Sequence, residues 1–165
     1  MLSKAMQSAF NEQIKNEIDS AYLYLGMAMY AEANNLPGFG SWLRVQWQEE
    51  LGHAMKLIGI IQDRGGRVVL EGIEKPQTDF KNPLAVFQQV LAHEQKVTTL
   101  INRLYETSVK ENDYAAQVEV QWFIKEQVEE EKTAALIIEQ LTMAGESGTS
   151  LLIMDRQLAL RSQGK

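Results

Sequence analysis

Apolar side chains recur at alternating three- and four-residue steps in four long stretches of the chain. That spacing places them on one face of an α-helix and is typical of a helix that packs against a core. Turn-forming residues separate the stretches, among them Gly65-Gly66 and Asn112-Asp113. The pattern therefore predicts four helices, with approximate bounds at residues 3–34, 39–64, 82–111 and 113–145.

Each apolar stripe is interrupted near its middle by residues that can bind a metal. In the second stretch Glu50 and His53 lie three residues apart, so a helix places them one above the other on the same face. A second set of metal-binding side chains follows at an offset of 77 residues. The pairs are Glu17 and Glu94, Glu49 and Glu126, Glu50 and Gln127, and His53 and Glu130. Four such helices would bring these groups to one point inside a bundle.

The charge of this polar layer indicates what it binds. Its stripe-facing glutamates are Glu17, Glu50, Glu94 and Glu130, and no Lys or Arg shares the stripes. Burial of one unpaired carboxylate costs several kcal/mol, and nearby like charges increase that cost. Two divalent cations would neutralise the layer. A lone Glu-x-x-His pair is commonly a chance match, but the agreement in register among four helices predicts a metal site.

The segment from Arg67 to Lys81 is too long for a simple turn between neighbouring helices. Fully extended at about 3.3 Å per residue, it would span about 50 Å, the length of a bundle. We therefore expect an all-α four-helix bundle with a long crossover loop between its second and third helices. Ser147–Ser150 precedes a short amphipathic helix that ends near Leu160. That fifth helix is too short to be stable alone, so its apolar residues must pack against the bundle or another subunit.

Composition narrows the functional classes. The chain has 165 residues, 45% of them hydrophobic and 23% charged, which fits one globular domain covering residues 1–165. A net charge of −6 favours neither nucleic acid nor an anionic membrane surface. The absence of cysteine excludes disulfides, thiolate zinc sites and a rubredoxin-type iron centre. The sequence shows no signal peptide or membrane-spanning segment, so we expect a cytoplasmic protein.

With these residues in place, the sequence resembles the bacterial non-haem ferritins of the ferritin-like di-iron family, over essentially all 165 residues. The resemblance implies that Glu17, Glu50 and His53 bind one iron ion. It also implies that Glu50 bridges to a second ion held by Glu94 and Glu130, with Gln127 beside it. A third iron ion would bind Glu49, Glu126 and Glu129, with Glu130 shared. Tyr24 falls at the family's tyrosine near the di-iron centre, and it is also compatible with a core aromatic that bonds through its hydroxyl.

The function implied by the resemblance is iron storage and detoxification. A ferroxidase of this family takes Fe(II) and dioxygen as substrates, forms Fe(III) and deposits ferric mineral inside a twenty-four-subunit shell. Two features argue against haem: Gln127-Val-Glu-Glu130 replaces the second Glu-x-x-His of a bacterioferritin, and Leu51 replaces its haem-ligating methionine. Animal ferritins have acidic channel residues where this chain has Gln117 and Val120, so the resemblance does not give the route of iron uptake.

Two alternatives remain at this level. One is a di-iron oxygenase or peroxidase that acts on another substrate. The other is a structural helical bundle or binding module, in which the glutamates of the stripes are only polar defects. Outside the stripes, His93 is expected at the surface or at an interface, and Trp122 is expected to serve in packing or as an electron donor near the site.

Overall fold

The computed structural model describes residues 1–161, and these residues form five α-helices and no strand. The helices are α1 (Lys4–Ala33), α2 (Pro37–Asp63), α3 (Pro83–Lys110), α4 (Tyr114–Ala144) and α5 (Gly148–Leu158). The predicted four-helix bundle with a short fifth helix is therefore confirmed. The fifth helix starts at Gly148 and ends at Leu158, slightly earlier than the sequence pattern indicated. None of the described helices is long and apolar enough to cross a membrane.

Side-chain caps begin four of the five helices. A side-chain oxygen accepts a backbone N–H three residues later at each N-cap, which satisfies a donor that the helix leaves free. These caps are Ser3, Asn82, Asp113 and Ser147. Helix α2 differs, because Leu36 supplies no such cap. Instead Asp155 of α5 accepts hydrogen bonds from the N–H groups of Gly38 and Phe39, at 2.8 and 3.0 Å.

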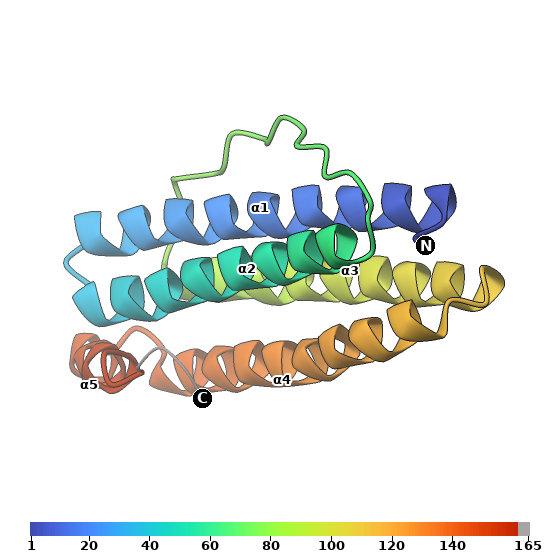
Figure 1. The fold of residues 1–165 in the computed structure, drawn as a ribbon. Helices are drawn as coiled ribbons and strands as arrows, with labels where there is room; N and C mark the ends of the chain where they lie inside the picture. The colour runs from blue at the N-terminus through green and yellow to red at the C-terminus, as the bar shows by residue number, and fades with distance from the viewer. Residues whose placement is uncertain (162–165) are drawn as a thin grey trace.

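The connection between α2 and α3 runs along the outside of α1 (Figure 1). The connection contacts α1 near the start, the middle and the end of that helix. The Asn11 side chain bonds the backbone of Arg67 and Val69, and the Asp19 side chain bonds the backbone of Glu74. Near the end of α1, the ring of Tyr30 packs against that of Phe80. The loop therefore travels most of the length of the bundle before α3 begins, as its length predicted. Its backbone groups are bonded by α1 side chains, which replaces the pairing that a helix would provide.

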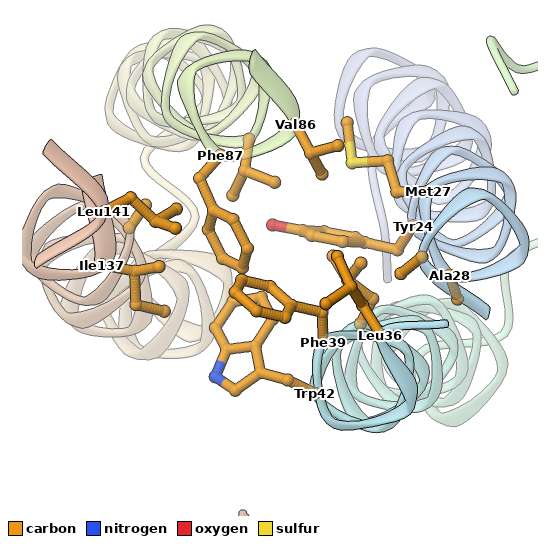
Figure 2. Close-up of a cluster of buried hydrophobic side chains, with 14 of the residues drawn as sticks. Tyr24, Met27, Ala28, Leu36, Phe39, Trp42, Val86, Phe87, Ile137 and Leu141 are labelled. Carbon is orange, nitrogen blue, oxygen red and sulfur yellow. The ribbon is translucent and has the colours of Figure 1, made fainter. Parts of the chain in front are cut away.

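Two apolar clusters fill the bundle, one toward each end. The cluster nearer α5 contains Tyr24, Phe39, Trp42 and Phe87, whose side chains face one another between the helices (Figure 2). The other cluster contains Met6, Phe10, Leu57, Ile101 and Phe123, among others. The predicted residues that lie buried between these clusters are Glu17, Glu50, His53, Glu94 and Gln127, contributed by all four long helices. Water is thus kept from both sides of a polar layer.

Candidate metal centre

The polar layer receives side chains from all four long helices, and most of them are buried. Exposed fractions are 1% for Glu17, 2% for Glu50, 7% for His53, 1% for Glu94 and 5% for Gln127, while Glu130 is partly exposed. Among residues 1–161, none of these glutamates forms an ion pair with Lys or Arg. The layer thus carries several buried carboxylates and no permanent positive charge.

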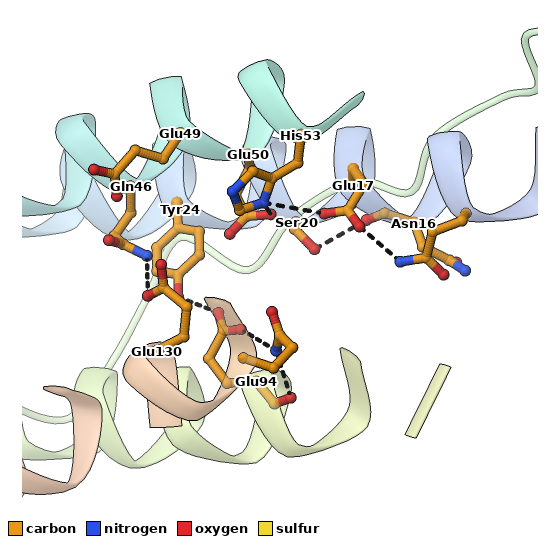
Figure 3. Close-up of polar contacts among 12 residues, drawn as sticks. Asn16, Glu17, Ser20, Tyr24, Gln46, Glu49, Glu50, His53, Glu94 and Glu130 are labelled. Atoms are coloured by element: carbon orange, nitrogen blue, oxygen red, sulfur yellow. Dashed lines mark hydrogen bonds and ion pairs between the residues drawn. The ribbon is translucent and has the colours of Figure 1, made fainter. Parts of the chain in front are cut away.

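The first half of the centre consists of Glu17, Glu50 and His53. One ligand atom from each lies within 4.8 Å of the others, and this is the only such group of three or more found in residues 1–161. His53 Nδ1 is 3.6 Å from Glu17 Oε2 and 3.5 Å from Glu50 Oε2 (Figure 3). The Gln13 amide donates to Glu17 Oε1 at 2.7 Å. Glu17 Oε2 is buried and has no hydrogen-bond partner among residues 1–161, which is costly for a carboxylate and suits a cation ligand.

Aromatic rings hold the imidazole of His53 in place. The ring centroid of His53 lies 5.4 Å from that of Trp122 and 5.8 Å from that of Phe123, both in edge-to-face geometry. These contacts restrict rotation of the imidazole and leave Nδ1 directed at the two carboxylates. Trp122 therefore packs directly against the first half, in the position that the sequence interpretation gave it.

The second half consists of Tyr24, Gln46, Glu94, Gln127 and Glu130. Its two carboxylates are held by neutral donors. The Tyr24 hydroxyl donates to Glu94 Oε1, and Gln127 Nε2 donates to Glu94 Oε2 at 3.0 Å. Gln46 Nε2 donates to Glu130 Oε2 at 2.8 Å (Figure 3). No imidazole belongs to this half.

Gln46 had no role in the sequence interpretation. It is fully buried, and its Oε1 has no hydrogen-bond partner. Its position in the sequence could have pointed to the polar layer, because Gln46 lies on the stripe of α2, one turn before Glu50, where an apolar residue would be usual. Gln46 and Glu17 thus place one unpartnered buried oxygen in each half.

The protonation of the layer reflects its excess negative charge. Burial raises the pKa of Glu50 well above its ordinary value, and burial together with the charge of Glu94 raises the pKa of Glu130 to about 7. Burial also raises the pKa of Glu94, although Tyr24 and Gln127 oppose that shift. Burial would lower the pKa of His53, but the contacts with Glu17 and Glu50 outweigh it and raise that pKa to about 11. Without a cation, the layer retains protons.

The residues predicted to form a third site are not gathered in the same way. Glu49 and Glu126 are partly buried, whereas the side chain of Glu129 is 67% exposed and lies 3.9 Å from Lys132. Glu49 instead pairs with Arg161, at 2.6 Å between Nη2 and Oε2. The sequence interpretation did not anticipate this partner, which lies 112 residues further along the chain.

His93, which was expected at the surface or at an interface, contacts α1 through its ring. Its ring is mostly buried between α1 and α3, with Nε2 at 2.7 Å from Ser20 Oγ and its centroid 6.4 Å from that of Tyr24. Burial lowers the pKa of His93 to about 4, so its ring is neutral near pH 7. The Ser20 hydroxyl also lies within hydrogen-bond distance of the carbonyl oxygen of Asn16, one turn earlier on α1. The residue fills the seam between two helices.

Comparison with known proteins gives consistent matches. A family model described as the ferritin-like domain matches residues 7–144. The bacterial non-heme ferritin of Bacteroides fragilis is 39% identical, with 98% of this chain and 100% of the relative covered. The bacterial non-heme ferritin of Campylobacter jejuni is 36% identical over 96% of this chain and 95% of its own.

Solved structures give the same result for the fold. An open-pore ferritin from the archaeon Archaeoglobus fulgidus superposes with a TM-score of 0.97 at 47% identity, covering 98% of this chain and 100% of that one. An engineered closed form of the Archaeoglobus fulgidus ferritin gives a TM-score of 0.98 at 46% identity, over 99% and 100% of the two chains.

Proposed function

Because this chain belongs to the ferritin family, we propose that it is an iron-storage ferroxidase. It oxidises Fe(II) to Fe(III) with dioxygen at the polar layer between its helices. The ferric product is then deposited as mineral inside a hollow shell of identical subunits, a twenty-four-subunit assembly by family resemblance. The bacterial relatives that support this proposal are named as non-heme ferritins.

One observation carries the proposal most directly. Several glutamates are buried together, and within residues 1–161 none of Glu17, Glu50 and Glu94 has a Lys or Arg partner. Such a layer is stable only if protons or cations compensate its charge. Carboxylate oxygens with one imidazole and no thiolate are ligands that suit iron.

The two halves of the centre would bind two Fe(II) ions as substrate. The first ion binds Glu17, Glu50 and His53, whose ligand atoms already lie close together. The second ion binds Glu94 and Glu130, with Gln127 beside it and Glu50 shared between the ions. Each ferrous ion gives one electron to dioxygen, which is thereby reduced to the oxidation level of hydrogen peroxide. Tyr24 holds Glu94 through its hydroxyl in this arrangement.

A third iron ion would bind at the edge formed by Glu49, Glu126 and Glu129, together with Glu130. This position lies outside the buried layer, and an iron ion that leaves the second half would bind there next. It would change how many iron ions are oxidised per dioxygen. The first turnover would not depend on it.

Assembly into a shell is supported by apolar side chains that the subunit leaves exposed. Helices α4 and α5 expose Val118, Val128, Leu136, Leu152 and Ile153, each by more than half. Each such side chain gains about 1.5–3 kcal/mol when it is fully buried, so the set favours contact with other subunits. The loop that crosses α1 also exposes Leu70 and Ile73.

Aerobic titration of the metal-free protein with Fe(II), followed by sizing of the product, tests the function. We expect rapid formation of Fe(III) and a large closed particle that retains the iron. Absence of iron-stimulated dioxygen consumption would reject the ferroxidase. A monomer or dimer at micromolar concentration in analytical ultracentrifugation would reject storage and leave a soluble di-iron oxidase.

Truncation after Gly145 tests the role of α5 in assembly. It removes Met154 from the core and Asp155 from the start of α2, so the four-helix subunit should fold with reduced stability. We expect a weakened shell that retains less mineral. The variant Asp155→Asn is the matched control, because it loosens the same anchor without removing the apolar surface of α5.

A further inference from the structure

Arg161 is the last described residue, and it lies against the acidic edge of the candidate centre. Its Nη2 donates to Glu49 Oε2 at 2.6 Å, and its guanidinium carbon is 4.5 Å from the centroid of the Trp42 ring. We propose that Arg161 is an internal competitor for the third iron ion, so that iron binding at Glu49 requires release of the Arg161 side chain. This inference rests on the third site of the proposed function and adds its regulation.

A structured element brings Arg161 to this place. Helix α5 lies at the end of the bundle where α2 begins (Figure 1). Asp155 anchors it there through the backbone N–H groups of Gly38 and Phe39. A Cβ atom at residue 38 would lie 1.7 Å from the carbonyl oxygen of Asp155, so only glycine permits this approach. The anchor and the ion pair are separated by about 16 Å along α2, at about 1.5 Å per residue.

The chain then turns at the end of α5. The Arg161 N–H bonds to the carbonyl of Leu158, and the Leu160 N–H bonds to the carbonyl of Gln157. These bonds direct Arg161 back along α2 toward Glu49. The guanidinium therefore reaches the acidic edge from a fixed backbone, which reduces the entropy lost when the ion pair forms.

The charge of this edge explains why a competitor matters. Within residues 1–161, Arg161 is the only Lys or Arg that forms an ion pair with Glu49, Glu126 or Glu130. The guanidinium and an Fe(II) ion would share the Glu49 carboxylate at a separation of a few ångströms, where two positive charges repel. The side chains of Arg161 and Glu49 are only 25% and 33% exposed, so water screens that repulsion incompletely.

The contact is also incompletely satisfied, as expected of a group that must be displaced. Arg161 Nη1 is buried and has no hydrogen-bond partner among residues 1–161. Release of the arginine would return that donor to water and leave only one ion pair and one cation–π contact to be broken. Because coupling between two binding equilibria is reciprocal, an ion at the third site must loosen the end of α5 by the same factor.

Calorimetric titration with Zn(II), which binds without being oxidised, measures the predicted competition in the assembled protein. We expect Arg161→Gln to tighten the weakest of three binding events roughly tenfold, the effect of losing one partly buried ion pair. Arg161→Lys is the matched control, since it keeps the positive charge and should stay close to the wild-type affinity. An unchanged or weaker third event in Arg161→Gln would overturn the proposal and make the arginine neutral or a positioning residue.

Glu49→Gln separates this inference from the function on which it rests. If three Zn(II) events persist in that variant, the third site itself is wrong. If the third event depends on Glu49 but not on Arg161, only the competitor is wrong.

Hydrogen exchange of wild-type protein gives a measurement that needs no variant at Arg161. Saturating Zn(II) should increase deuterium uptake in residues 155–161, and unchanged uptake would contradict the proposal.

Discussion

The two halves of the candidate metal centre differ in how their carboxylates are satisfied. In the first half, Glu17 and Glu50 face the Nδ1 atom of His53, and one Glu17 oxygen has no hydrogen-bond partner. In the second half, neutral amides occupy the carboxylates: Gln127 bonds Glu94 and Gln46 bonds Glu130. The first half therefore has its ligand atoms gathered and one Glu17 oxygen without a hydrogen bond, although Gln13 holds the other Glu17 oxygen. In the second half, both carboxylates are tied to the protein by amide donors.

This difference predicts an order of binding. An ion that binds in the first half displaces protons, and it can bind the Glu17 oxygen that has no hydrogen bond to break. An ion that enters the second half must first break hydrogen bonds from Gln46 and Gln127, and each bond of this kind contributes about 1.5–3 kcal/mol when one partner is charged. We expect the first half to bind Fe(II) more tightly than the second. The following variants and conditions test that contrast.

Removal of the first half should have the largest effect. In the double variant Glu50→Ala and His53→Ala, we expect fast aerobic Fe(II) oxidation to fall by at least about 100-fold, because two of three gathered ligands are lost. The shell should still assemble, as sizing would show. Glu139→Ala, on an exposed part of α4, is the control and should keep the normal rate. A wild-type rate in the double variant would reject the assignment of both residues.

Acid should weaken the second half. Burial raises the pKa of Glu130 to about 7, so the carboxyl carries a proton below that pH and must lose it before Fe(II) binds. The affinity of the second half for Fe(II) is therefore highest above pH 7 and decreases as the pH falls. For one displaced proton, it decreases by about fivefold between pH 7 and pH 6. Anaerobic calorimetry in buffers of different ionisation enthalpy measures that proton. Glu130→Gln should abolish its release, and equal release from both proteins would refute the explanation.

Replacing the amide of Gln127 should reduce the contrast between the halves. In Gln127→Glu, a carboxylate replaces a neutral donor to Glu94, so the second half gains a ligand charge and loses a hydrogen bond that opposes metal binding. We expect its Fe(II) affinity to rise about three- to tenfold while that of the first half is unchanged. Anaerobic titration resolves the two events. Two equal sites in the wild type, with neither altered by the substitution, would argue against the asymmetry.

Changes at the outer edge should have the smallest effect. Glu49→Ala with Glu126→Ala should change the iron oxidised per dioxygen by less than about twofold, since neither residue belongs to the buried layer. The initial fast phase should remain. Stopped-flow oxidation with simultaneous dioxygen measurement distinguishes the two quantities. Loss of the fast phase would place these residues in the primary centre.

Much of the centre was predictable because helix periodicity is a local property. The spacing of Glu50 and His53 fixes their shared face once α2 forms, and the offset of 77 residues predicted partners at a similar level in other helices. The length of the loop that contains residues 67–81 predicted the crossover, since chain length limits the distance that a segment can span. These inferences need only the order of residues and the geometry of one helix.

Other features depend on residues that are distant in the sequence. Asp155 caps α2 from 117 positions away, and nothing near Leu36 indicates that cap. His93 was expected at the surface or at an interface because it precedes the stripe residue Glu94, and only the folded structure shows that Ser20 of α1 is its polar partner in the seam between two helices. Gln46 interrupts the apolar stripe of α2, and only its hydrogen bond to Glu130 in the folded structure explains its presence there.

The sequence by itself determined the four long helices and the crossover loop, because helix period and turn residues act within short segments. It also determined the types of candidate ligand in the polar layer, because the cost of buried charge does not depend on the exact position of each side chain. Only the tertiary structure decided that Glu17 Oε2 has no hydrogen-bond partner among residues 1–161, which amides hold the second half and that Arg161 pairs with Glu49. Hydrogen bonds and ion pairs require two groups to approach within about 3–4 Å in the correct orientation. The packing of the helices fixes that approach, and the residue pattern along any one of them does not.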